Sequence, residues 1–370
     1  MAGTGFPERI VRWVFVERGK PLERRETPPP PLKGGEVLVE VAGCGVCHTD
    51  LGFYYQGVPT RRGLPITLGH EVSGRVVAAG DDTLESLVGR SVIVPAVMPC
   101  GECDLCRDGF GSICPRQVFP GSDIDGGFAS HLVVPGRDLC LVETQQEGEG
   151  ETIGASGVGL AELSVIADAV TTPYQSIVRS GLREGDLAIF VGVGGVGSFG
   201  VQLAAALGAY VVALDVSPLK LDRIAHFGAR FTIDVRDLDH RSVKKRIIAH
   251  AKAEGLPTTR WKIFETSGTT AGQELAFSLL GPGAYLGVVG YTRSDVCIPL
   301  SRLMAFDATA RGNWGCHPRH YPEVLSLVLA GKVKIAPFVE SHPMSEINEV
   351  FPKLHEQLIT KRPVLIPDFA

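Results

Sequence analysis

Hydrophobic residues follow two different patterns along the chain. Residues 36–50, 71–82 and 89–97 alternate apolar and polar positions between glycine-rich turns, which is typical of strands with one face on a core. Residues 187–214 carry no charged side chain, and strands buried on both faces of a parallel sheet also read as continuous apolar runs. The two patterns predict a β-rich domain followed by an α/β domain.

The uncharged run 187–214 is longer than the roughly 20 residues that a membrane-spanning helix needs. It divides, however, into a β-rich segment at 187–191, a glycine turn, an alanine- and leucine-rich helical segment at 198–209 and a second β-rich segment at 210–215. A strand, turn, helix and second strand therefore explain the run better than a membrane helix, and we expect no membrane partner.

The glycine turn follows the order G-x-G-x-x-G, with Gly192, Gly194 and Gly197 at the glycine positions and Gly195 between them. In a dinucleotide-binding loop the first glycine allows a tight turn, the second lets a pyrophosphate approach the backbone, and the third brings helix and strand together. The N-terminus of the following helix faces the anion. We therefore assign these four glycines to a dinucleotide site.

Asp215 closes the next strand, 18 residues after the last of these glycines and near the spacing of about 20 at which an acid binds the adenosine ribose. A carboxylate there accepts hydrogen bonds from the 2'-hydroxyl and repels a 2'-phosphate, which favours NAD over NADP. Lys220 either flanks the ribose or is an ordinary surface lysine at a helix start. Residues 261–268 and 283–292 read as two more buried strands, which extends a Rossmann sheet to about residue 310.

Composition sets the broad class. With 370 residues, of which 44% are hydrophobic and 21% charged, the chain is long enough for two domains with separate cores. Its formal net charge of −5 offers no basic surface, so we expect no nucleic-acid partner. Residues 1–15 lack the apolar segment and cleavage site of a signal peptide, which indicates a cytoplasmic location. Because thiols stay reduced there, clustered cysteines favour metal binding or catalysis over disulfides.

Four of the nine cysteines, Cys100, Cys103, Cys106 and Cys114, follow the spacing C-x2-C-x2-C-x7-C. One loop of this kind can surround a tetrahedral ion, and four thiolates make a closed zinc site. An iron–sulfur cluster is the alternative, since similar C-x2-C runs bind clusters. Either shell leaves no position open for a substrate, so residues 100–114 are predicted to be structural and the chemistry to lie elsewhere.

A catalytic zinc needs three protein ligands and one open position. The chain offers Cys47 and His48 in one segment, and His70 and Glu71 in another. An isolated histidine is more often structural than a ligand, so these pairs alone leave the question open.

The segments GVCHTD (45–50) and GHEVSGRVVAAG (69–80), the four-cysteine loop and VGVGGVG (191–197) occur in one order and spacing. In this respect the sequence resembles the zinc-containing medium-chain alcohol dehydrogenases over essentially its whole length. The combination is far more specific than any single motif. The resemblance implies NAD as cofactor and two zinc ions per chain, one catalytic and one structural.

The resemblance also implies the architecture. Residues 169–310 are expected to form a Rossmann NAD-binding domain with a doubly wound parallel sheet. Residues 1–168 and 311–370 are expected to form a β-rich GroES-like catalytic domain that includes the four-cysteine loop, giving an α/β protein. Residues 361–369 resemble the family's closing strand.

Candidate zinc ligands follow from the matching positions. Cys47 and His70 match the first two catalytic zinc ligands of that family, and Glu71 matches the neighbouring acid that can exchange at the metal. The third ligand varies within the family among Cys, Asp and Glu. Asp168 is the expected third ligand here, with Glu162 as the substitute; a helix cap is the alternative role for Asp168.

Other site residues are implied in the same way. Asp50 matches an acid that orients the ligating histidine, and Thr49 matches the hydroxyl that contacts the substrate oxygen and the cofactor ribose. Members with the longest-known proton relay have a histidine where this chain has Gly52, so His48 either replaces it or contacts the NAD pyrophosphate. Arg362 matches a basic residue that can reach the cofactor phosphates, although a surface arginine is also consistent.

The resemblance implies oxidation of a small-molecule alcohol with hydride passing to NAD. Within the family, residues 154–177 and the overall length are most similar to the 6-hydroxycyclohex-1-ene-1-carbonyl-CoA dehydrogenases of anaerobic benzoyl-CoA degradation, which oxidise a ring secondary alcohol to the 6-oxo product. Arg61 and Arg62 either contact the CoA phosphates or lie in a solvated loop. A general cyclic, aryl or polyol alcohol dehydrogenase is the alternative, and the family implies a homodimer or homotetramer.

Overall fold

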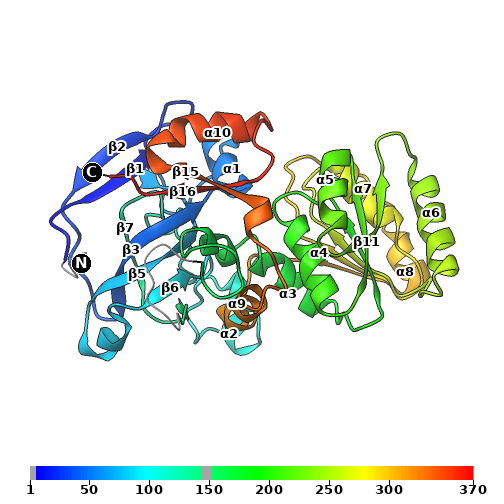
Figure 1. The fold of residues 1–370 in the computed structure, drawn as a ribbon, viewed down its shortest axis with the longest axis horizontal. Helices are drawn as coiled ribbons and strands as arrows, with labels where there is room; N and C mark the ends of the chain where they lie inside the picture. Colours follow the sequence, from blue (N-terminus) through cyan, green and yellow to red (C-terminus); the bar gives the residue numbers. More distant parts are fainter. Residues whose placement is uncertain (1–5, 144–151, 370) are drawn as a thin grey trace. The chain divides into compact units, whose positions relative to one another are not determined.

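The computed structural model describes residues 6–143 and 152–369, and the chain forms two compact units. The first unit consists of Met1–Thr171, Gly315–Gly331 and Ile335–Ala370, and the second of Thr172–Trp314 and Lys332–Lys334 (Figure 1). The domain boundaries expected from the sequence, after residues 168 and 310, lie a few residues earlier. Residues 1–5, part of the stretch expected to lack a signal peptide, lie outside the described residues.

The first unit is rich in strands. They are β1 (Ile10–Phe15), β2 (Glu23–Thr27), β3 (Glu36–Gly45), β4 (Ile66–Thr67), β5 (Glu71–Ala79), β6 (Ser91–Val94), β7 (His131–Pro135), β8 (Cys140–Leu141), β15 (Val339–Pro343) and β16 (Arg362–Ile366). Its α-helices are α1 (His48–Gln56), α2 (Asp104–Arg107), α9 (Tyr321–Leu329) and α10 (Ile347–His355), and the 3-10 helix η3 (Glu162–Ala167) also belongs to it.

Two sheets enclose the core of the first unit. The larger has the order β15-β16-β3-β5-β6-β8 with β7 also paired to β3, and the smaller has the order β2-β1-β4. All of these pairings are antiparallel except that of β15 with β16. Strand β3 is central because it pairs with β5, β7 and β16, and only Glu40 among its residues is exposed.

The predicted strand segment 36–50 changes to a helix after ten residues. Cys47 is the N-cap of α1, and the Asp50 carboxylate accepts a hydrogen bond from the Cys47 backbone N–H, which forms half of a capping box. Gly57, with φ 68°, ends the helix in the left-handed conformation that glycine adopts without strain. The local sequence thus turns the chain sharply at Cys47.

The second unit alternates helices with strands. The helices are α3 (Thr171–Arg179), α4 (Gly197–Ala206), α5 (Pro218–Ala225), α6 (His240–Ala253), α7 (Thr270–Ser278) and α8 (Ser301–Phe306). The strands are β9 (Leu187–Val191), β10 (Tyr210–Asp215), β11 (Ala229–Asp234), β12 (Lys262–Glu265), β13 (Tyr285–Val288) and β14 (Thr309–Gly312).

These strands form one parallel sheet in the order β11-β10-β9-β12-β13-β14. The direction of winding reverses between β9 and β12, and ligands of doubly wound sheets bind at the carboxyl ends of the strands beside such a reversal. The uncharged run 187–214 forms β9, α4 and most of β10. Within the described residues, none of the helices combines the length and the apolar character needed to cross a bilayer.

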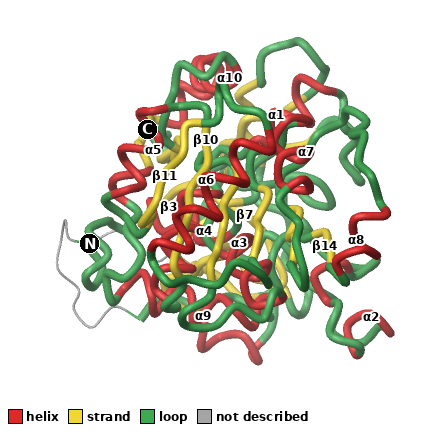
Figure 2. The backbone as a smooth tube through the Cα atoms, turned by 90° about the vertical axis from the view of Figure 1, so that its right-hand side faces the viewer, coloured by secondary structure: helices red, strands yellow, loops and turns green. Residues whose placement is uncertain are grey.

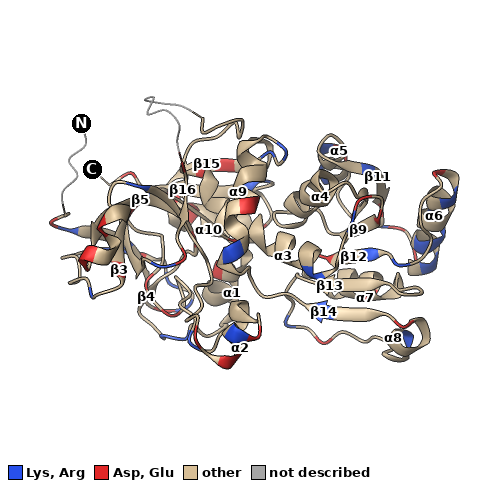
Figure 3. Cartoon of the chain, turned by 90° about the horizontal axis from the view of Figure 1, so that it is seen from below, with Lys and Arg blue, Asp and Glu red and all other residues tan. Residues whose placement is uncertain are grey.

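The two faces of the parallel sheet are covered by different helices. Ile189 and Val191 of β9 pack in one cluster with Val243 of α6 and residues of α7. Phe190, whose side chain points the other way, is in contact with Gly200 of α4. Figure 2 looks onto α6, and Figure 3 shows that Lys and Arg gather on this helix while both signs of charge are mixed elsewhere.

Candidate active site and metal centres

Four side chains of the first unit converge on one point. The group consists of Cys47 at the N-cap of α1, His70 immediately before β5, Glu71 at the start of β5, and Asp168 immediately after η3. One ligand atom from each residue lies within 4.8 Å of those of the other three. Three separate segments of the chain therefore deliver a thiol, an imidazole and two carboxylates to the same place.

The spacing of three of these atoms suits a tetrahedral ion. Asp168 Oδ2 lies 3.6 Å from Cys47 Sγ and 3.5 Å from His70 Nε2. Ligands that bind zinc tetrahedrally at about 2.0–2.3 Å lie about 3.3–3.7 Å from each other. Glu162, the substitute ligand in the sequence prediction, instead accepts hydrogen bonds from the Ser341 hydroxyl (2.8 Å) and the Gly159 N–H (3.1 Å).

His70 is suited to a metal because its ring is buried and its nitrogens are not otherwise used. Its side chain is 1% exposed, and within the described residues neither ring nitrogen makes a hydrogen bond. Burial lowers the pKa of the imidazole, but the carboxylates of Asp50 and Asp168 outweigh it and raise the pKa well above its ordinary value. The same negative surroundings favour a cation between the side chains.

Asp50 ties the first two candidate ligands together. Its buried carboxylate accepts hydrogen bonds from the Cys47 N–H (2.9 Å) and the Gly69 N–H (3.0 Å), and Oδ1 lies 3.5 Å from His70 Nδ1. The acid thus lies behind the imidazole, where a carboxylate fixes ring orientation in metal sites. The half-buried Thr49 hydroxyl lies 3.6 Å from Cys47 Sγ, whereas His48 is exposed at the start of α1.

Glu71 is bound on its other side by Arg362. The guanidinium donates from Nε to Oε2 (2.7 Å) and from a terminal nitrogen to Oε1 (2.5 Å), and the Ala169 N–H donates to Oε1 (3.0 Å). Burial raises the pKa of Glu71 to about 7, although Arg362 opposes this shift. Arg362 is only 4% exposed and its described hydrogen bonds go to Glu71, so its contact with the cofactor phosphates stays a prediction.

The four-cysteine loop brings its sulfurs to the spacing of a single tetrahedral ion. Cys103 Sγ lies 3.4 Å from that of Cys106 and 3.6 Å from that of Cys114, and the sulfurs of Cys100 and Cys106 are 3.9 Å apart. Four thiolates at about 2.3 Å from one zinc lie about 3.8 Å from each other. Thiolates on different irons of a cluster must lie further apart, so the geometry favours zinc over the iron–sulfur alternative.

Backbone N–H groups surround these sulfurs. Cys114 Sγ accepts from the N–H groups of Cys100 (3.5 Å) and Arg116 (3.3 Å). The N–H of Glu102 likewise lowers the pKa of Cys100 to about 6, which favours its thiolate. All nine cysteines of the chain are free of disulfides. The thiols are therefore available as metal ligands.

The glycine loop of the second unit is tightly packed at Gly192 and Gly197 but has free space at Gly194. Gly192 has φ 88°, and a Cβ there would lie 2.6 Å from the Ser267 Cα. A Cβ at Gly197 would lie 2.0 Å from the Gly192 carbonyl oxygen, whereas one at Gly194 would meet nothing within 4 Å. The first and third glycines thus serve packing, and the free space at Gly194 fits the approach of a pyrophosphate. Gly195 is exposed at the tip of the loop.

Asp215 lies beside this loop at the carboxyl end of β10. Its buried carboxylate accepts hydrogen bonds from the Val193 N–H (2.8 Å) and the Ser217 N–H (2.9 Å). The predicted glycines and acid therefore meet at the reversal point of the sheet. Lys220 is half-buried in the first turn of α5, where its backbone N–H is bound by Ser217.

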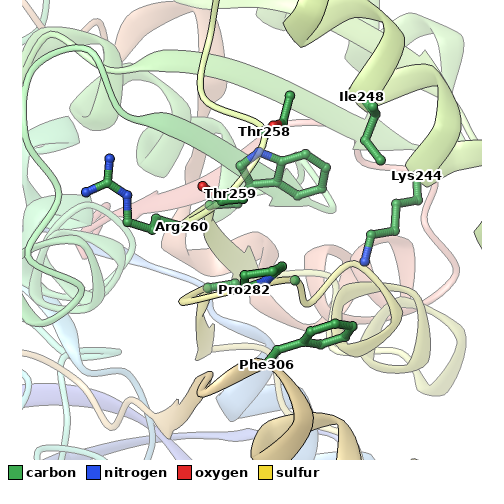
Figure 4. Close-up of a pocket in the computed structure, with 10 residues that line it drawn as sticks. Lys244, Ile248, Thr258, Thr259, Arg260, Pro282 and Phe306 are labelled. Carbon is green, nitrogen blue, oxygen red and sulfur yellow. The ribbon is translucent and has the colours of Figure 1, made fainter.

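A cavity of about 240 Å³ also lies in the second unit (Figure 4). Its polar groups include Lys244, whose ammonium group donates to the Leu280 carbonyl (2.6 Å), and its walls include Trp261 and Phe306. No histidine, cysteine or carboxylate lines it. The lining therefore offers no metal ligand of these kinds, and the candidate chemistry belongs to the sites above.

Two residues near the metal-ligand group carried no signal in the sequence. The Phe119 ring lies 5.0 Å from the His70 ring, centroid to centroid, and forms a small buried apolar cluster with Ala96 and Val97. Tyr321 is fully buried and its hydroxyl donates to the Ala167 carbonyl, next to Asp168. Neither belongs to a motif, and only the three-dimensional contacts identify them.

Comparison with known proteins agrees with this geometry. Residues 33–144 match the alcohol dehydrogenase GroES-like domain, and residues 195–330 match the zinc-binding dehydrogenase domain. An alcohol dehydrogenase of Geobacillus stearothermophilus is 31% identical, and the alignment covers 95% of this chain and 97% of that protein. An NAD-dependent alcohol dehydrogenase of Sulfurisphaera tokodaii is 27% identical over 95% of this chain and 99% of that protein.

A solved structure shares the whole fold. The crystal structure of the alcohol dehydrogenase from the hyperthermophilic archaeon Aeropyrum pernix is 30% identical, with a TM-score of 0.82 over 96% of this chain and 100% of that chain. The predicted α/β architecture, with a GroES-like part and a Rossmann sheet, is thereby confirmed. The chain belongs to the zinc-dependent medium-chain alcohol dehydrogenase family and is an oxidoreductase whose cofactors are NAD and zinc.

Proposed function

We propose that this enzyme transfers hydride between a secondary, cyclic alcohol or ketone and NAD, with its catalytic zinc bound by Cys47, His70 and Asp168. The observation that carries the proposal is the position of Asp168 Oδ2, 3.6 Å from Cys47 Sγ and 3.5 Å from His70 Nε2. A zinc ion held by these three side chains would keep one position open for a substrate oxygen. Glu71, the fourth member of the group, is the acid that can exchange at the metal.

Zinc, when bound, supplies a Lewis acid that makes an alcohol easier to deprotonate, and NAD accepts hydride. The residues of the first unit position the groups and move the proton. Asp50 fixes the Cys47 backbone and the His70 ring. The Thr49 hydroxyl takes the substrate proton, and since Gly52 offers no side chain to continue a relay, His48 passes it to water.

The cofactor is bound by the second unit in this proposal. The open side of Gly194 admits the pyrophosphate, and the N-terminus of α4 stabilises its charge. Asp215 accepts hydrogen bonds from the adenosine ribose, which excludes a 2'-phosphate. Lys220 flanks the ribose.

The substrate is proposed to have an apolar body. Phe119 packs against the His70 ring and joins Ala96 and Val97 in a cluster separate from the main core of the unit. Apolar side chains beside the metal ligands support a substrate with a hydrocarbon ring, because burying such a ring gains about 25 cal/mol per Å² of apolar area removed from water.

The narrower proposal is that the substrate is 6-hydroxycyclohex-1-ene-1-carbonyl-CoA and the product its 6-oxo form, in anaerobic degradation of aromatic compounds. The similarity of residues 154–177 and the apolar cluster support it. A second candidate, a free cyclic or aryl alcohol, is supported by the state of the two arginines assigned to CoA. Arg61 Nε lies 3.2 Å from the Asp123 carboxylate, and an Arg62 nitrogen lies 2.9 Å from that of Asp125.

Initial rates of NADH formation separate these substrates. We compare the hydroxycyclohexenyl CoA thioester with the free cyclic alcohol at equal concentration. A preference above about a hundredfold for the thioester, or about 2.7 kcal/mol, identifies an acyl-CoA enzyme. Comparable rates exclude the CoA assignment, and absence of turnover with both alcohols contradicts the proposal for a cyclic substrate.

The ligand assignment is tested by zinc content. Asp168→Asn should lower bound zinc from two ions per chain to one and reduce kcat by at least about a hundredfold, since one anionic ligand is lost. Glu162→Gln is the matched control and should keep both ions. Full activity and two zinc ions in Asp168→Asn would exclude Asp168 as the third ligand.

We also propose that the enzyme is a cytoplasmic homo-oligomer. The second unit exposes large apolar side chains at Tyr291, Leu300, Met304 and Trp314, and β14 is one of the two edge strands of its sheet. Exposed apolar side chains of this size support association with another copy of the chain. Analytical ultracentrifugation should show a dimer or tetramer, and Met304→Glu should shift it toward monomer.

A further inference from the structure

We propose that Tyr321 is a positioning residue for the catalytic metal: its hydroxyl fixes the peptide that precedes Asp168 and links it to the segment that leads into the four-cysteine loop. This inference rests on the proposed role of Asp168 as a zinc ligand. It adds a residue that belongs to neither ligand set and acts through the backbone.

The contacts of the Tyr321 hydroxyl are all within the first unit. Tyr321 begins α9 and is fully buried. Its hydroxyl donates a hydrogen bond to the Ala167 carbonyl and accepts one from the Ala96 N–H at 3.2 Å. Ala96 lies between β6 and Cys100, and Ala167 is the last residue of η3. One hydroxyl therefore joins two segments that lead to different metal centres.

The peptide groups on both sides of Asp168 are anchored. On one side, the Ala167 carbonyl accepts from Tyr321 and also from the Thr171 hydroxyl at 3.3 Å. On the other side, the Ala169 N–H donates to Glu71 Oε1 at 3.0 Å. Because Asp168 has a short side chain, movement of either peptide would displace its Oδ2 from the 3.5–3.6 Å spacing that the metal requires.

The segment 315–321 also packs directly on the four-cysteine region. A Cβ at Gly315 would lie 2.8 Å from Val97 Cγ2, and a Cβ at Gly111 would lie 2.7 Å from His317 Cδ2. This segment is thus in close contact both with the residues before Cys100 and with the loop itself. Tyr321 consequently links the peptide before Asp168 to the segment that leads into the four-cysteine loop.

The test uses Tyr321→Phe in the full-length enzyme, loaded with zinc or with cobalt(II). The ring remains, but the Ala167 carbonyl loses one partner and the buried Ala96 N–H loses its acceptor. Outer partners of metal ligands typically contribute about 10–100-fold to activity or metal affinity. We expect kcat to fall by about that factor, and the KM for NAD to change by less than about twofold because the cofactor loop is untouched.

Metal release provides a readout that does not depend on turnover. In Tyr321→Phe, one metal ion should be lost to a chelator about tenfold faster than in the wild type, while the four-cysteine ion keeps its rate. The visible absorption bands of cobalt at the catalytic site should also shift, because Asp168 Oδ2 is displaced. A variant that only loses stability would not change the cobalt spectrum.

Two further variants make the test specific. Tyr54 is a buried tyrosine of the same unit whose hydroxyl donates to the Lys20 carbonyl (2.8 Å), so Tyr54→Phe removes a similar bond and should leave the cobalt spectrum and release rate unchanged. Thr171→Val removes the second hydrogen bond to Ala167 and should give a smaller shift in the same direction. If Tyr321→Phe fails to fold, Thr171→Val still tests whether the hydrogen bonds to the Ala167 carbonyl position Asp168.

The outcomes separate this inference from the proposed zinc site. If Asp168→Asn changes the cobalt spectrum but neither Tyr321→Phe nor Thr171→Val does, Tyr321 is not a positioning residue and the ligand assignment stands. If Asp168→Asn leaves the spectrum unchanged as well, the ligand assignment itself is wrong. Equal effects of Tyr321→Phe and Tyr54→Phe would also overturn the positioning role.

Discussion

Arg362 and Glu71 are 291 positions apart in the sequence and form a bidentate ion pair. The distance between Arg362 Nε and Glu71 Oε2 is 2.7 Å. Both side chains are almost completely buried, at 4% and 0% exposure. A buried ion pair of this kind contributes less to the stability of the fold than its short distances suggest, because both charged groups are desolvated. Removing one partner, however, leaves the other charge uncompensated.

Arg362→Gln should therefore reduce the free energy of unfolding by about 3–5 kcal/mol, the usual cost of a single buried charge. Adding Glu71→Gln in the double variant should recover part of this loss, because no unpaired carboxylate remains. Urea unfolding of the zinc-loaded proteins measures both. Losses that simply add in the double variant would show that the two residues do not stabilise each other.

Alanine at two glycines of the dinucleotide loop should give different defects. Gly194→Ala places its methyl group in open space, so the protein should fold normally but bind NAD at least about tenfold more weakly, because the pyrophosphate must approach there. Gly197→Ala places its methyl group 2.0 Å from the Gly192 carbonyl oxygen and should lose about 1–3 kcal/mol of stability.

Isothermal titration with NAD and thermal unfolding of both variants check this difference. If Gly194→Ala bound NAD like the wild type, the pyrophosphate would have to lie elsewhere. If Gly197→Ala were as stable as the wild type, the backbone at Gly192 would have to move away from the new methyl group without any loss of stability.

Loss of one thiolate should empty the four-cysteine centre. Cys114→Ser is expected to retain one zinc ion in place of two and to unfold about 5–10 °C lower, because metal binding at a structural site contributes to folding. Cys140→Ser is the control, since Cys140 is also buried but belongs to neither cysteine-containing metal group. Elemental analysis with differential scanning calorimetry measures both, and two zinc ions in Cys114→Ser would contradict the assignment.

A histidine that belongs to neither metal-ligand group should make the stability of the fold depend on pH. Burial lowers the pKa of His131 below its ordinary 6.5, although Glu40 on the paired strand opposes the shift. Below pH 6.5 the unfolded chain therefore binds more protons at this position than the folded one, so stability is full above that pH and falls as the pH decreases toward the folded pKa.

His131→Asn should reduce this dependence. The free energy of unfolding, measured in urea at pH 5 and pH 7.5, should change less between the two pH values in the variant than in the wild type. An equal change in both proteins would mean that other groups cause the acid sensitivity.

Local patterns explain why the second unit was predicted well. Residues 187–215 contain their strand periodicity, their glycine spacing and their acid within one continuous segment, so short-range geometry determines their arrangement. The four cysteines at 100–114 are likewise confined to one loop. In both cases the residues that act together are close along the chain.

The remaining features depend on contacts that no local pattern encodes. Asp168 lies 121 positions from Cys47, and its place as a candidate ligand came from the family resemblance rather than from spacing. The support of its peptide by Tyr321 spans 154 positions and carries no motif. The ion pairs of Arg61 and Arg62 with the loop at 123–125 were also missed, because exposed arginines are compatible with many partners.

Strand β3 is synthesised early, but its partner strand β16 is the last strand of the chain, so this pairing can form only when synthesis is almost finished. The end of β3 leads directly into Cys47, and the Val46 N–H is bound by the Pro363 carbonyl (2.9 Å) in the strand that begins with Arg362. A nascent chain on the ribosome therefore contains Cys47, His70 and Asp168 before it contains Arg362, the cation paired with Glu71. A truncation that ends before residue 362 would keep every proposed zinc ligand and still leave a buried, uncompensated carboxylate beside the metal.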